Sequence, residues 1–149
     1  MNKVHLFITD KCNLRCPTCF VAASNRFENE LSTQEWKNVI TGLNEFKFIA
    51  ETHVEGGEPF LRKDLVDILA DYKHKSGVVL ATNGTVPYKP EYDELKRIKR
   101  LSFSIESYNS EHHQAIKARN LDKVVKNLER FRDAGFYVNT NSVLTTINY

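Results

Sequence analysis

The stretch KCNLRCPTCF, residues 11–20, contains all three cysteines of this 149-residue chain. Cys12, Cys16 and Cys19 have the spacing C-x3-C-x2-C and come directly after VHLFIT, residues 4–9, which has the composition of a β-strand. A secreted disulfide-bonded domain would instead distribute an even number of cysteines along the chain. Three clustered thiols therefore indicate a metal site in a protein from a reducing compartment.

The composition predicts one globular domain of ordinary size. Hydrophobic residues make up 41% of the chain and aromatic residues 11%, enough to form a buried core. The net charge is +2, from 21 basic and 19 acidic residues, so charge gives no reason to expect nucleic acid or a membrane surface as an obligate partner. No apolar run approaches the length of a membrane span, and Asp10 comes too early for a signal peptide. We therefore expect a cytoplasmic protein.

Strand-like runs alternate with helical patterns along the chain. The predicted strands lie at residues 4–9, 48–54, 77–84 (a strand that ends in a turn), 100–107 and 136–146. Helices are predicted around residues 32–43, 64–72, 91–97 and 122–134. Ser32 with Glu35 fits a capping box, and Asp64 is a candidate cap for the second helix. Alternation of this kind predicts an α/β fold, a partial (open) TIM-like barrel with a mostly parallel sheet of about five βα units. A complete barrel needs about 250 residues.

Unusual residues gather where the predicted strands end, which is where parallel α/β folds bind ligands. In chain order these residues are the three cysteines, GGEP at 56–59, TNG at 82–84, Ser104 with Glu106, and Asn139 with Asn141. The connection that carries the cysteines is also long, about twenty residues where two to six are usual. The sequence therefore predicts one shared site at this rim of the sheet.

Three thiolates are one ligand short of the four that a cysteine metal site usually has. Soft thiolates select zinc, copper(I) or iron–sulfur clusters. A structural zinc site would need a fourth ligand, and the candidate histidines, none of which has motif spacing, are His5, His53, His112 and His113. A four-iron cluster held by three cysteines would instead leave one iron open for a cofactor or substrate.

The pairing of C-x3-C-x2-C after the first strand with GGEP after the second resembles the radical S-adenosylmethionine (radical SAM) superfamily. The resemblance extends over residues 4–148. The segments SIES, residues 104–107, and NSVLTTIN, residues 141–148, are similar to the subgroup of molybdenum-cofactor biosynthesis and peptide-modifying enzymes.

The resemblance implies that Cys12, Cys16 and Cys19 ligate three irons of a [4Fe–4S] cluster and that S-adenosylmethionine chelates the fourth. It also implies that Gly56 and Gly57 let the backbone approach the cofactor. Glu58 would help to hold the methionine amine of the cofactor. The other implied cofactor-binding residues are Pro59, Thr82, Ser104, Glu106 and Asn141.

The same resemblance implies a reaction and a set of partners. The reduced cluster would cleave S-adenosylmethionine to a 5′-deoxyadenosyl radical, which abstracts hydrogen from the substrate. A flavodoxin- or ferredoxin-like protein would supply the electron. The substrate is expected to be a peptide, a nucleotide or a small metabolite, and the sequence does not distinguish among them or identify a catalytic side chain.

The chain departs from the family pattern in three places. Thr18 stands before the last cysteine, where many members have an aromatic residue near the adenine, and Phe20 is a candidate replacement. No cysteine follows Cys19 to bind an auxiliary cluster. The common core has six βα units, so we expect residues 1–149 to be a core domain truncated after the fifth strand. It would be a fragment of a longer protein, or its open edge would be covered by an oligomer or a partner chain.

Two further hypotheses stay open at this stage. The chain could be a non-catalytic or partner-dependent cluster-binding subunit, or a structural zinc domain. Several residues also have structural interpretations. Ser104 and Glu106 would then form a solvated strand end or a buried hydrogen-bonded pair, and residues 82–84 would form an ordinary turn. His112 and His113 are expected at an exposed helix start.

Overall fold

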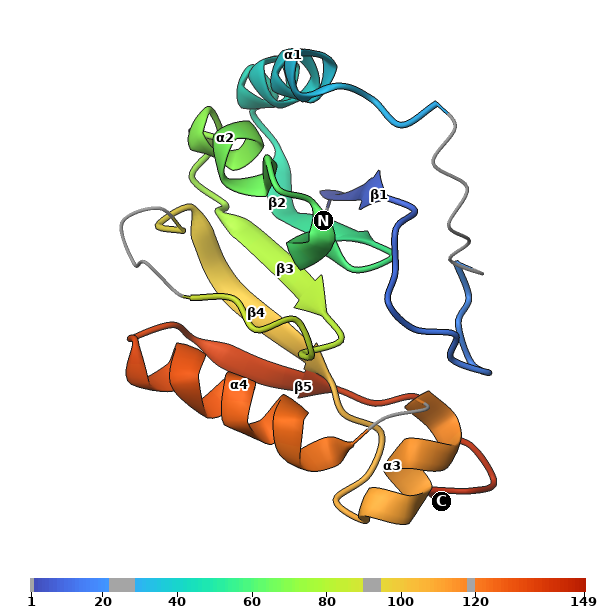
Figure 1. Ribbon diagram of the computed structural model, residues 1–149. Helices are drawn as coiled ribbons and strands as arrows, with labels where there is room; N and C mark the ends of the chain where they lie inside the picture. The colour runs from blue at the N-terminus through green and yellow to red at the C-terminus, as the bar shows by residue number, and fades with distance from the viewer. Residues whose placement is uncertain (1, 22–28, 90–94, 118–119) are drawn as a thin grey trace.

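The computed structural model describes residues 2–21, 29–89, 95–117 and 120–149. Over these residues five strands form one sheet in the order β1-β2-β3-β4-β5, and every neighbouring pair is parallel (Figure 1). The strands are β1 (Asn2–Thr9), β2 (Ile49–Gly56), β3 (Val78–Thr82), β4 (Ile98–Ser104) and β5 (Val138–Asn141). This confirms the predicted α/β fold with an open, parallel sheet. In the described part of the chain no helix has the length and apolar character that crossing a membrane requires.

The helices are α1 (Thr33–Asn44), α2 (Leu65–Ala70), α3 (Ser110–Lys117) and α4 (Leu121–Asp133), with a short 3-10 turn, η1 (Pro59–Leu61). Ser32 and Glu35 form the predicted capping box at the start of α1. The cap prediction for Asp64 is wrong, because its side chain makes no capping hydrogen bond and accepts bonds from other side chains instead. Most of the helix predicted at residues 91–97 lies outside the described residues, and residues 95–97 form a turn.

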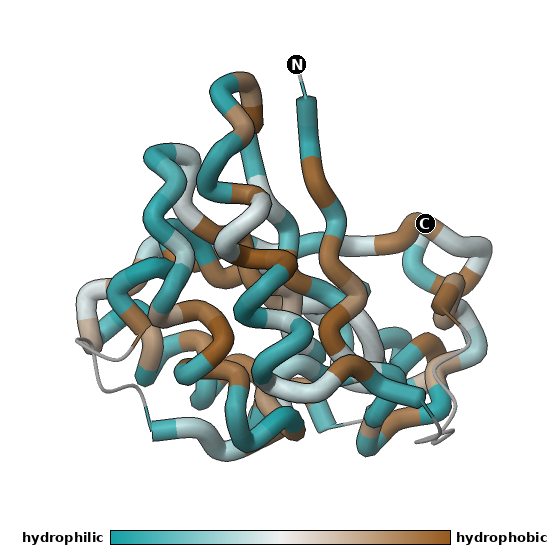
Figure 2. The backbone as a smooth tube through the Cα atoms, turned by 90° about the horizontal axis from the view of Figure 1, so that it is seen from above, coloured by the Kyte–Doolittle hydropathy of each residue, from teal (hydrophilic) through white to brown (hydrophobic). Residues whose placement is uncertain are grey.

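One hydrophobic core lies between the helices and one face of the sheet. Alternate residues of β1, β3 and β4 enter it, such as Leu6 and Ile8 of β1, because side chains of a strand point to opposite faces in turn. Figure 2 shows the resulting alternation of hydrophilic and hydrophobic residues at the start of β1, next to the N-terminus. Helices contribute fully buried side chains, including Ile40 of α1 and Ile68 of α2. The opposite face carries polar side chains of β1 and β2, which include His5, His53 and Glu55.

Candidate functional site

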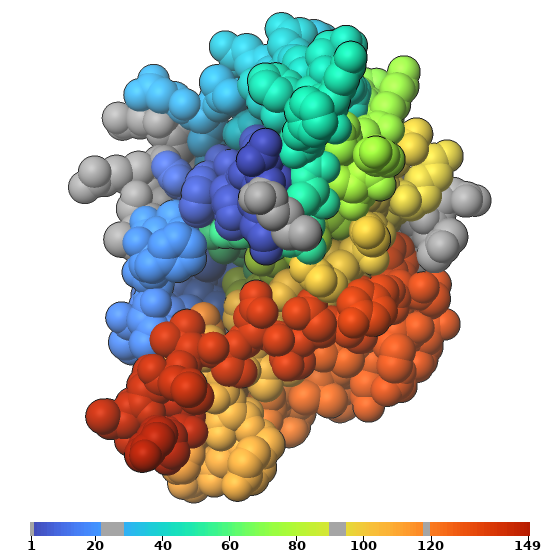
Figure 3. Space-filling view, turned by 180° about the vertical axis from the view of Figure 1, so that it is seen from behind, coloured from blue at the N-terminus to red at the C-terminus, as the bar shows by residue number. Residues whose placement is uncertain are grey.

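A cavity of about 390 Å³ lies at the carboxyl end of the sheet and collects most of the predicted site residues. The predicted residues that line it are Cys12, Cys16, Cys19, Gly56, Gly57, Thr82, Ser104, Glu106 and Asn141. In Figure 3 the segment with the cysteines, in blue, and the C-terminal segment, in red, approach each other at this end of the molecule. The ends of β2, β3, β4 and β5 and the segment that follows β1 thus contribute to one concave surface, as the alternation of strands and helices predicted.

The two glycines of GGEP lie against the start of the cysteine segment. A Cβ on Gly56, whose φ is +136°, would lie 2.3 Å from the carbonyl oxygen of Thr9, and one on Gly57 would lie 2.2 Å from that of Lys11. The Gly57 amide donates to the Thr9 carbonyl at 2.7 Å, and the Glu58 amide donates to the Lys11 carbonyl at 2.7 Å. Glycine is therefore needed here because two backbone segments touch, a reason that the sequence alone did not indicate.

Glu58 is fully buried and does not line the cavity. Its carboxylate accepts hydrogen bonds from the Thr82 hydroxyl at 2.8 Å, the Asn83 amide at 2.7 Å and the Phe60 amide at 3.2 Å. Pro59, which follows it at the start of η1, is buried as well. Glu58 therefore ties the end of β2 to the end of β3 behind the cavity wall.

The three cysteines are half-buried thiols that form no disulfide bond. The Cys12 sulfur accepts a hydrogen bond from the Leu14 amide at 3.4 Å and a weak one from the Asn83 side-chain amide at 3.9 Å. Burial raises the pKa of the Cys12 thiol above its ordinary value, although the Leu14 bond opposes this. The Cys16 thiol donates to the carbonyl of Lys117 at 3.6 Å, so this segment contacts the end of α3.

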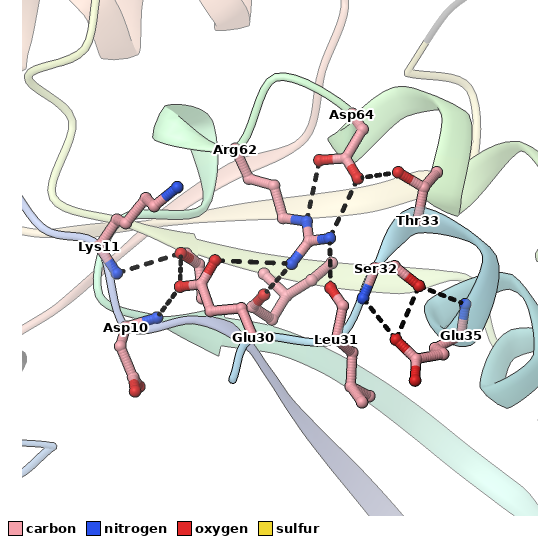
Figure 4. A network of polar contacts seen from close by, with 11 residues as sticks. Asp10, Lys11, Glu30, Leu31, Ser32, Thr33, Glu35, Arg62 and Asp64 are labelled. Carbon is pink, nitrogen blue, oxygen red and sulfur yellow. Dashed lines mark hydrogen bonds and ion pairs between the residues drawn. The ribbon is translucent and has the colours of Figure 1, made fainter. Parts of the chain in front are cut away.

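Glu30 holds the far end of the cysteine-bearing connection against β1. Its carboxylate accepts from the Thr9 hydroxyl at 2.7 Å and from the Asp10 amide at 2.8 Å (Figure 4). The Lys11 amide also donates to the Thr9 hydroxyl, at 3.1 Å. Although partial burial acts the other way, the bonds from Thr9 and Asp10 hold the pKa of Glu30 below its ordinary value. The residues just before the cysteines are thus fixed by a residue that follows them.

Arg62, whose side chain is 8% exposed, completes this arrangement. Its guanidinium donates to the carbonyl oxygens of Ile8 and Leu31, at 2.9 and 2.8 Å, and forms two bonds to the Asp64 carboxylate, at 2.9 and 3.0 Å (Figure 4). Thr33 donates to the same carboxylate at 2.5 Å. Hydrogen bonds from Arg62 and Thr33 lower the pKa of Asp64 against the opposing effect of burial. We call Glu30, Arg62 and Asp64 the Arg62 clamp.

Glu106 lines the cavity, and protein groups already bind its carboxylate. The Lys117 ammonium lies 2.9 Å from one oxygen, and the Val143 amide donates to the other at 2.5 Å. The Glu106 amide in turn donates to His113 Nδ1 at 3.2 Å. His113 is fully buried, so its predicted exposure is wrong, whereas His112 is exposed as predicted. Glu106 thus joins β4, α3 and the segment after β5.

The remaining predicted residues differ in how they meet the cavity. Ser104 is partly buried and Asn141 is exposed, and both line it. The Asn141 carbonyl accepts from the Ile105 amide at 3.0 Å, which fixes this part of the wall. Asn139 does not line the cavity. The side chains of Thr18 and Phe20 lie at its rim, where Phe20 is 82% exposed.

Several residues that line the cavity were not among the predicted cofactor-binding or metal-binding residues, and they include Glu55, Asn83 and Lys117. Asn83 contacts the Cys12 sulfur, and its place in the turn TNG was the available signal. Lys117 lies at the end of α3, far along the chain from any strand end, and no pattern indicated it. Only the packing of α3 against the cysteine segment brings Lys117 to the site.

The family model for the radical SAM superfamily matches residues 6–148 of the chain. Over 81 residues the chain is 44% identical to the PqqA peptide cyclase of Bradyrhizobium diazoefficiens, covering 54% of the chain and 20% of that protein. Over 155 residues it is 32% identical to the GTP 3′,8-cyclase of Aquifex aeolicus, covering 95% of the chain and 47% of that protein. The chain therefore spans less than half the length of each of these relatives.

The fold is also that of a solved structure. SuiB of Streptococcus suis, bound to S-adenosylmethionine, superposes on the chain with a TM-score of 0.82 at 20% identity. The superposition covers 97% of the chain and 34% of SuiB. At this level of identity the likeness establishes the fold alone.

Proposed function

The chain belongs to the radical SAM superfamily, and we propose that it is the core of a radical SAM enzyme whose cavity holds an iron–sulfur cluster and S-adenosylmethionine. The observation that carries this proposal is the convergence of three cysteine thiols with Gly56, Gly57 and the ends of β3, β4 and β5 on one cavity of about 390 Å³. The family match applies to the domain, so the activity is a proposal for this chain.

The number of thiols at the cavity favours a cluster over a structural zinc ion. A structural zinc site is usually closed by four protein ligands, whereas three cysteine thiols line this cavity. A [4Fe–4S] cluster places each cysteine on a different iron, and three cysteines leave one iron for another ligand. We propose this cluster type for Cys12, Cys16 and Cys19.

When bound, the cluster and S-adenosylmethionine would together supply a 5′-deoxyadenosyl radical that abstracts hydrogen from a substrate. The chain's own residues would position the cofactor. Gly56 and Gly57 would present backbone to it, and Thr82, Ser104 and Asn141 would contact it from the other strand ends. Glu58 would act as a positioning residue, because its carboxylate already binds Thr82 and Asn83.

The substrate class stays broad in this proposal. The two relatives compared above are named for a peptide and for GTP, and the chain spans less than half of either. We propose a substrate with an abstractable C–H hydrogen and a small electron-transfer protein of the flavodoxin or ferredoxin type as reductant.

Reconstitution tests the proposal directly. The chain is loaded with iron and sulfide under anaerobic conditions, reduced with dithionite and given S-adenosylmethionine, and 5′-deoxyadenosine is measured. The proposal predicts this product, and predicts its loss in Cys16→Ala. A loaded cluster that binds S-adenosylmethionine without cleaving it would favour a partner-dependent cluster-binding subunit instead. A chain that takes up one zinc ion and no iron would contradict both.

A further inference from the structure

His5, His53 and Glu55 form a compact cluster on the polar face of the sheet. His5 of β1 is the register partner of His53 of β2, and their rings stack with centroids 4.7 Å apart. One Glu55 carboxylate oxygen lies 3.0 Å from His5 Nδ1 and 3.5 Å from His53 Nδ1. Zinc–ligand bonds of about 2.0–2.2 Å place neighbouring tetrahedral ligands about 3.3–3.5 Å apart. The two nitrogen–oxygen distances are therefore close to those between ligands of one metal ion, and all three ligand atoms lie within 4.8 Å of one another.

A second carboxylate orients one of the two imidazoles. Glu51 Oε2 lies 3.1 Å from His53 Nε2, and Glu51 is itself held by Lys3 at 2.8 Å and Arg100 at 3.2 Å. When His53 donates its Nε2 proton to Glu51, its Nδ1 carries the lone pair that a metal needs. Metal-ligating histidines usually have such a carboxylate partner on the ring nitrogen opposite the metal. Glu51 thus supplies the outer contact of a metal site.

We propose that His5, His53 and Glu55 bind a divalent transition-metal ion, with Zn²⁺ the best match. Two imidazoles and one carboxylate are the ligand set of open, catalytic zinc sites, in which a fourth position stays free for water or substrate. Glu55 also lines the cavity at the carboxyl end of the sheet, and the His5 side chain is 46% exposed. An ion here has a path from solvent and lies beside the cavity, where a substrate oxygen or nitrogen is able to complete its coordination.

This site is separate from the cysteines, so it does not depend on the proposed function. The sequence offered His5 and His53 as possible fourth ligands of a cysteine zinc site. In the structure these histidines face Glu55 instead. Among the described residues, the metal-binding atoms of His5, His53 and Glu55 all lie within 4.8 Å of one another. The competing interpretation is an ion-pair network that binds no metal.

The test removes the three cysteines and keeps His5, His53 and Glu55. The variant Cys12→Ser/Cys16→Ser/Cys19→Ser is titrated with Zn²⁺ by calorimetry, and one ion per chain is expected. Adding His53→Gln is expected to lower the affinity at least 100-fold, and adding Glu51→Gln about 10-fold, since loss of an outer-shell partner costs about 10–100-fold. The control is His112→Gln, on the exposed surface of α3, which is expected to leave the affinity unchanged.

No zinc binding by a folded triple variant, or equal affinity with and without His53→Gln, would overturn the site. If circular dichroism shows the triple variant unfolded, Co²⁺ bound to the wild-type chain and to His5→Gln is counted after gel filtration. The site predicts one ion fewer in His5→Gln, and equal counts would overturn it. Iron uptake by the cysteines is measured on the same His5→Gln variant and is expected to be unchanged, which separates this result from failure of the proposed function.

Discussion

Glu58 and Glu106 are the two buried carboxylates among the described residues, and protein groups already bind both. The resemblance to the radical SAM superfamily implied that both bind the cofactor, and Glu106 was also noted as a polar residue near the end of a strand. In the structure Glu58 accepts three hydrogen bonds behind the cavity wall, whereas Glu106 reaches the cavity and pairs with Lys117. A buried carboxylate with partners of this kind fixes the positions of the groups that it binds. Its removal is therefore expected to lower the free energy of unfolding.

Replacement of Glu58 by glutamine is therefore expected to destabilise the chain. In Glu58→Gln one side-chain oxygen remains as an acceptor, but an NH₂ group replaces the other. That NH₂ group then faces a donor, either the Thr82 hydroxyl or the Asn83 amide. We expect the free energy of unfolding to fall by about 1–3 kcal/mol in urea titrations. Glu129→Gln, on the exposed face of α4, is the control and should change it by no more than about 0.5 kcal/mol. Equal losses in the two variants would show that the Glu58 bonds are not specific.

Gly57 and Gly42 form a matched pair for testing the contact between the GGEP segment and the cysteine segment. A Cβ on Gly57 meets the Lys11 backbone at 2.2 Å, whereas one on Gly42, in α1, meets nothing within 4 Å. We expect Gly57→Ala to lower the free energy of unfolding by about 1–3 kcal/mol, as overpacking does, and to reduce iron uptake. Gly42→Ala is expected to raise it by about 0.5–1 kcal/mol. Normal iron uptake and stability in Gly57→Ala would contradict the close contact.

The Arg62 clamp acts at the scale of elements, since it joins β1, the start of α1 and the start of α2. Glu30 and Asp64 both have a lowered pKa in the folded chain, so each contributes stability that is complete above its ordinary pKa of 4.5 or 3.8. That contribution is lost as pH falls through the lowered folded-state values. We expect the urea midpoint of the wild-type chain to decrease as pH is lowered from 6 toward about 3.

The variant Arg62→Met separates the contribution of the Arg62 clamp to the pH dependence of stability from that of the other carboxylates of the chain. Without the guanidinium, the pKa of Asp64 returns toward its ordinary value, and less stability depends on its ionisation. The midpoint of the variant should be lower than that of the wild type at pH 6, and the difference should shrink on acidification. A difference that stays constant across this range would contradict a contribution from the pairing of Arg62 with Asp64, and would leave only its bonds to the carbonyl oxygens of Ile8 and Leu31 and its packing.

Element boundaries were predicted well where one local pattern decides them and poorly where a distant contact does. The capping box of Ser32 and Glu35 depends on two residues close in sequence, and it was predicted correctly. The fifth strand was predicted to reach residue 146 but ends at Asn141, because the Val143 amide turns toward the Glu106 carboxylate. For α3 the sequence indicated only a helix start near His112 and His113 and not its extent, because the helix buries only His113 and Ile116, too few residues for a visible helical period.

At the scale of the whole molecule, the site was predictable because the sheet is parallel. Every strand then ends at the same rim, so residues that are far apart in sequence and follow different strands must meet. The sequence could not show that the GGEP glycines contact the cysteine segment, or that α3 brings Lys117 beside Glu106. Both depend on how loops and a helix pack onto the rim, which no pattern of spacing encodes.

The central claim is that three cysteines hold a four-iron cluster and leave one iron for S-adenosylmethionine. The most direct measurement is the electron paramagnetic resonance spectrum of the anaerobically loaded, reduced chain, recorded with and without S-adenosylmethionine. We predict about four irons per chain and a spectrum that changes when S-adenosylmethionine is added, because the cofactor becomes a ligand of the open iron. A reduced four-iron cluster whose spectrum stays the same at saturating S-adenosylmethionine would contradict the account.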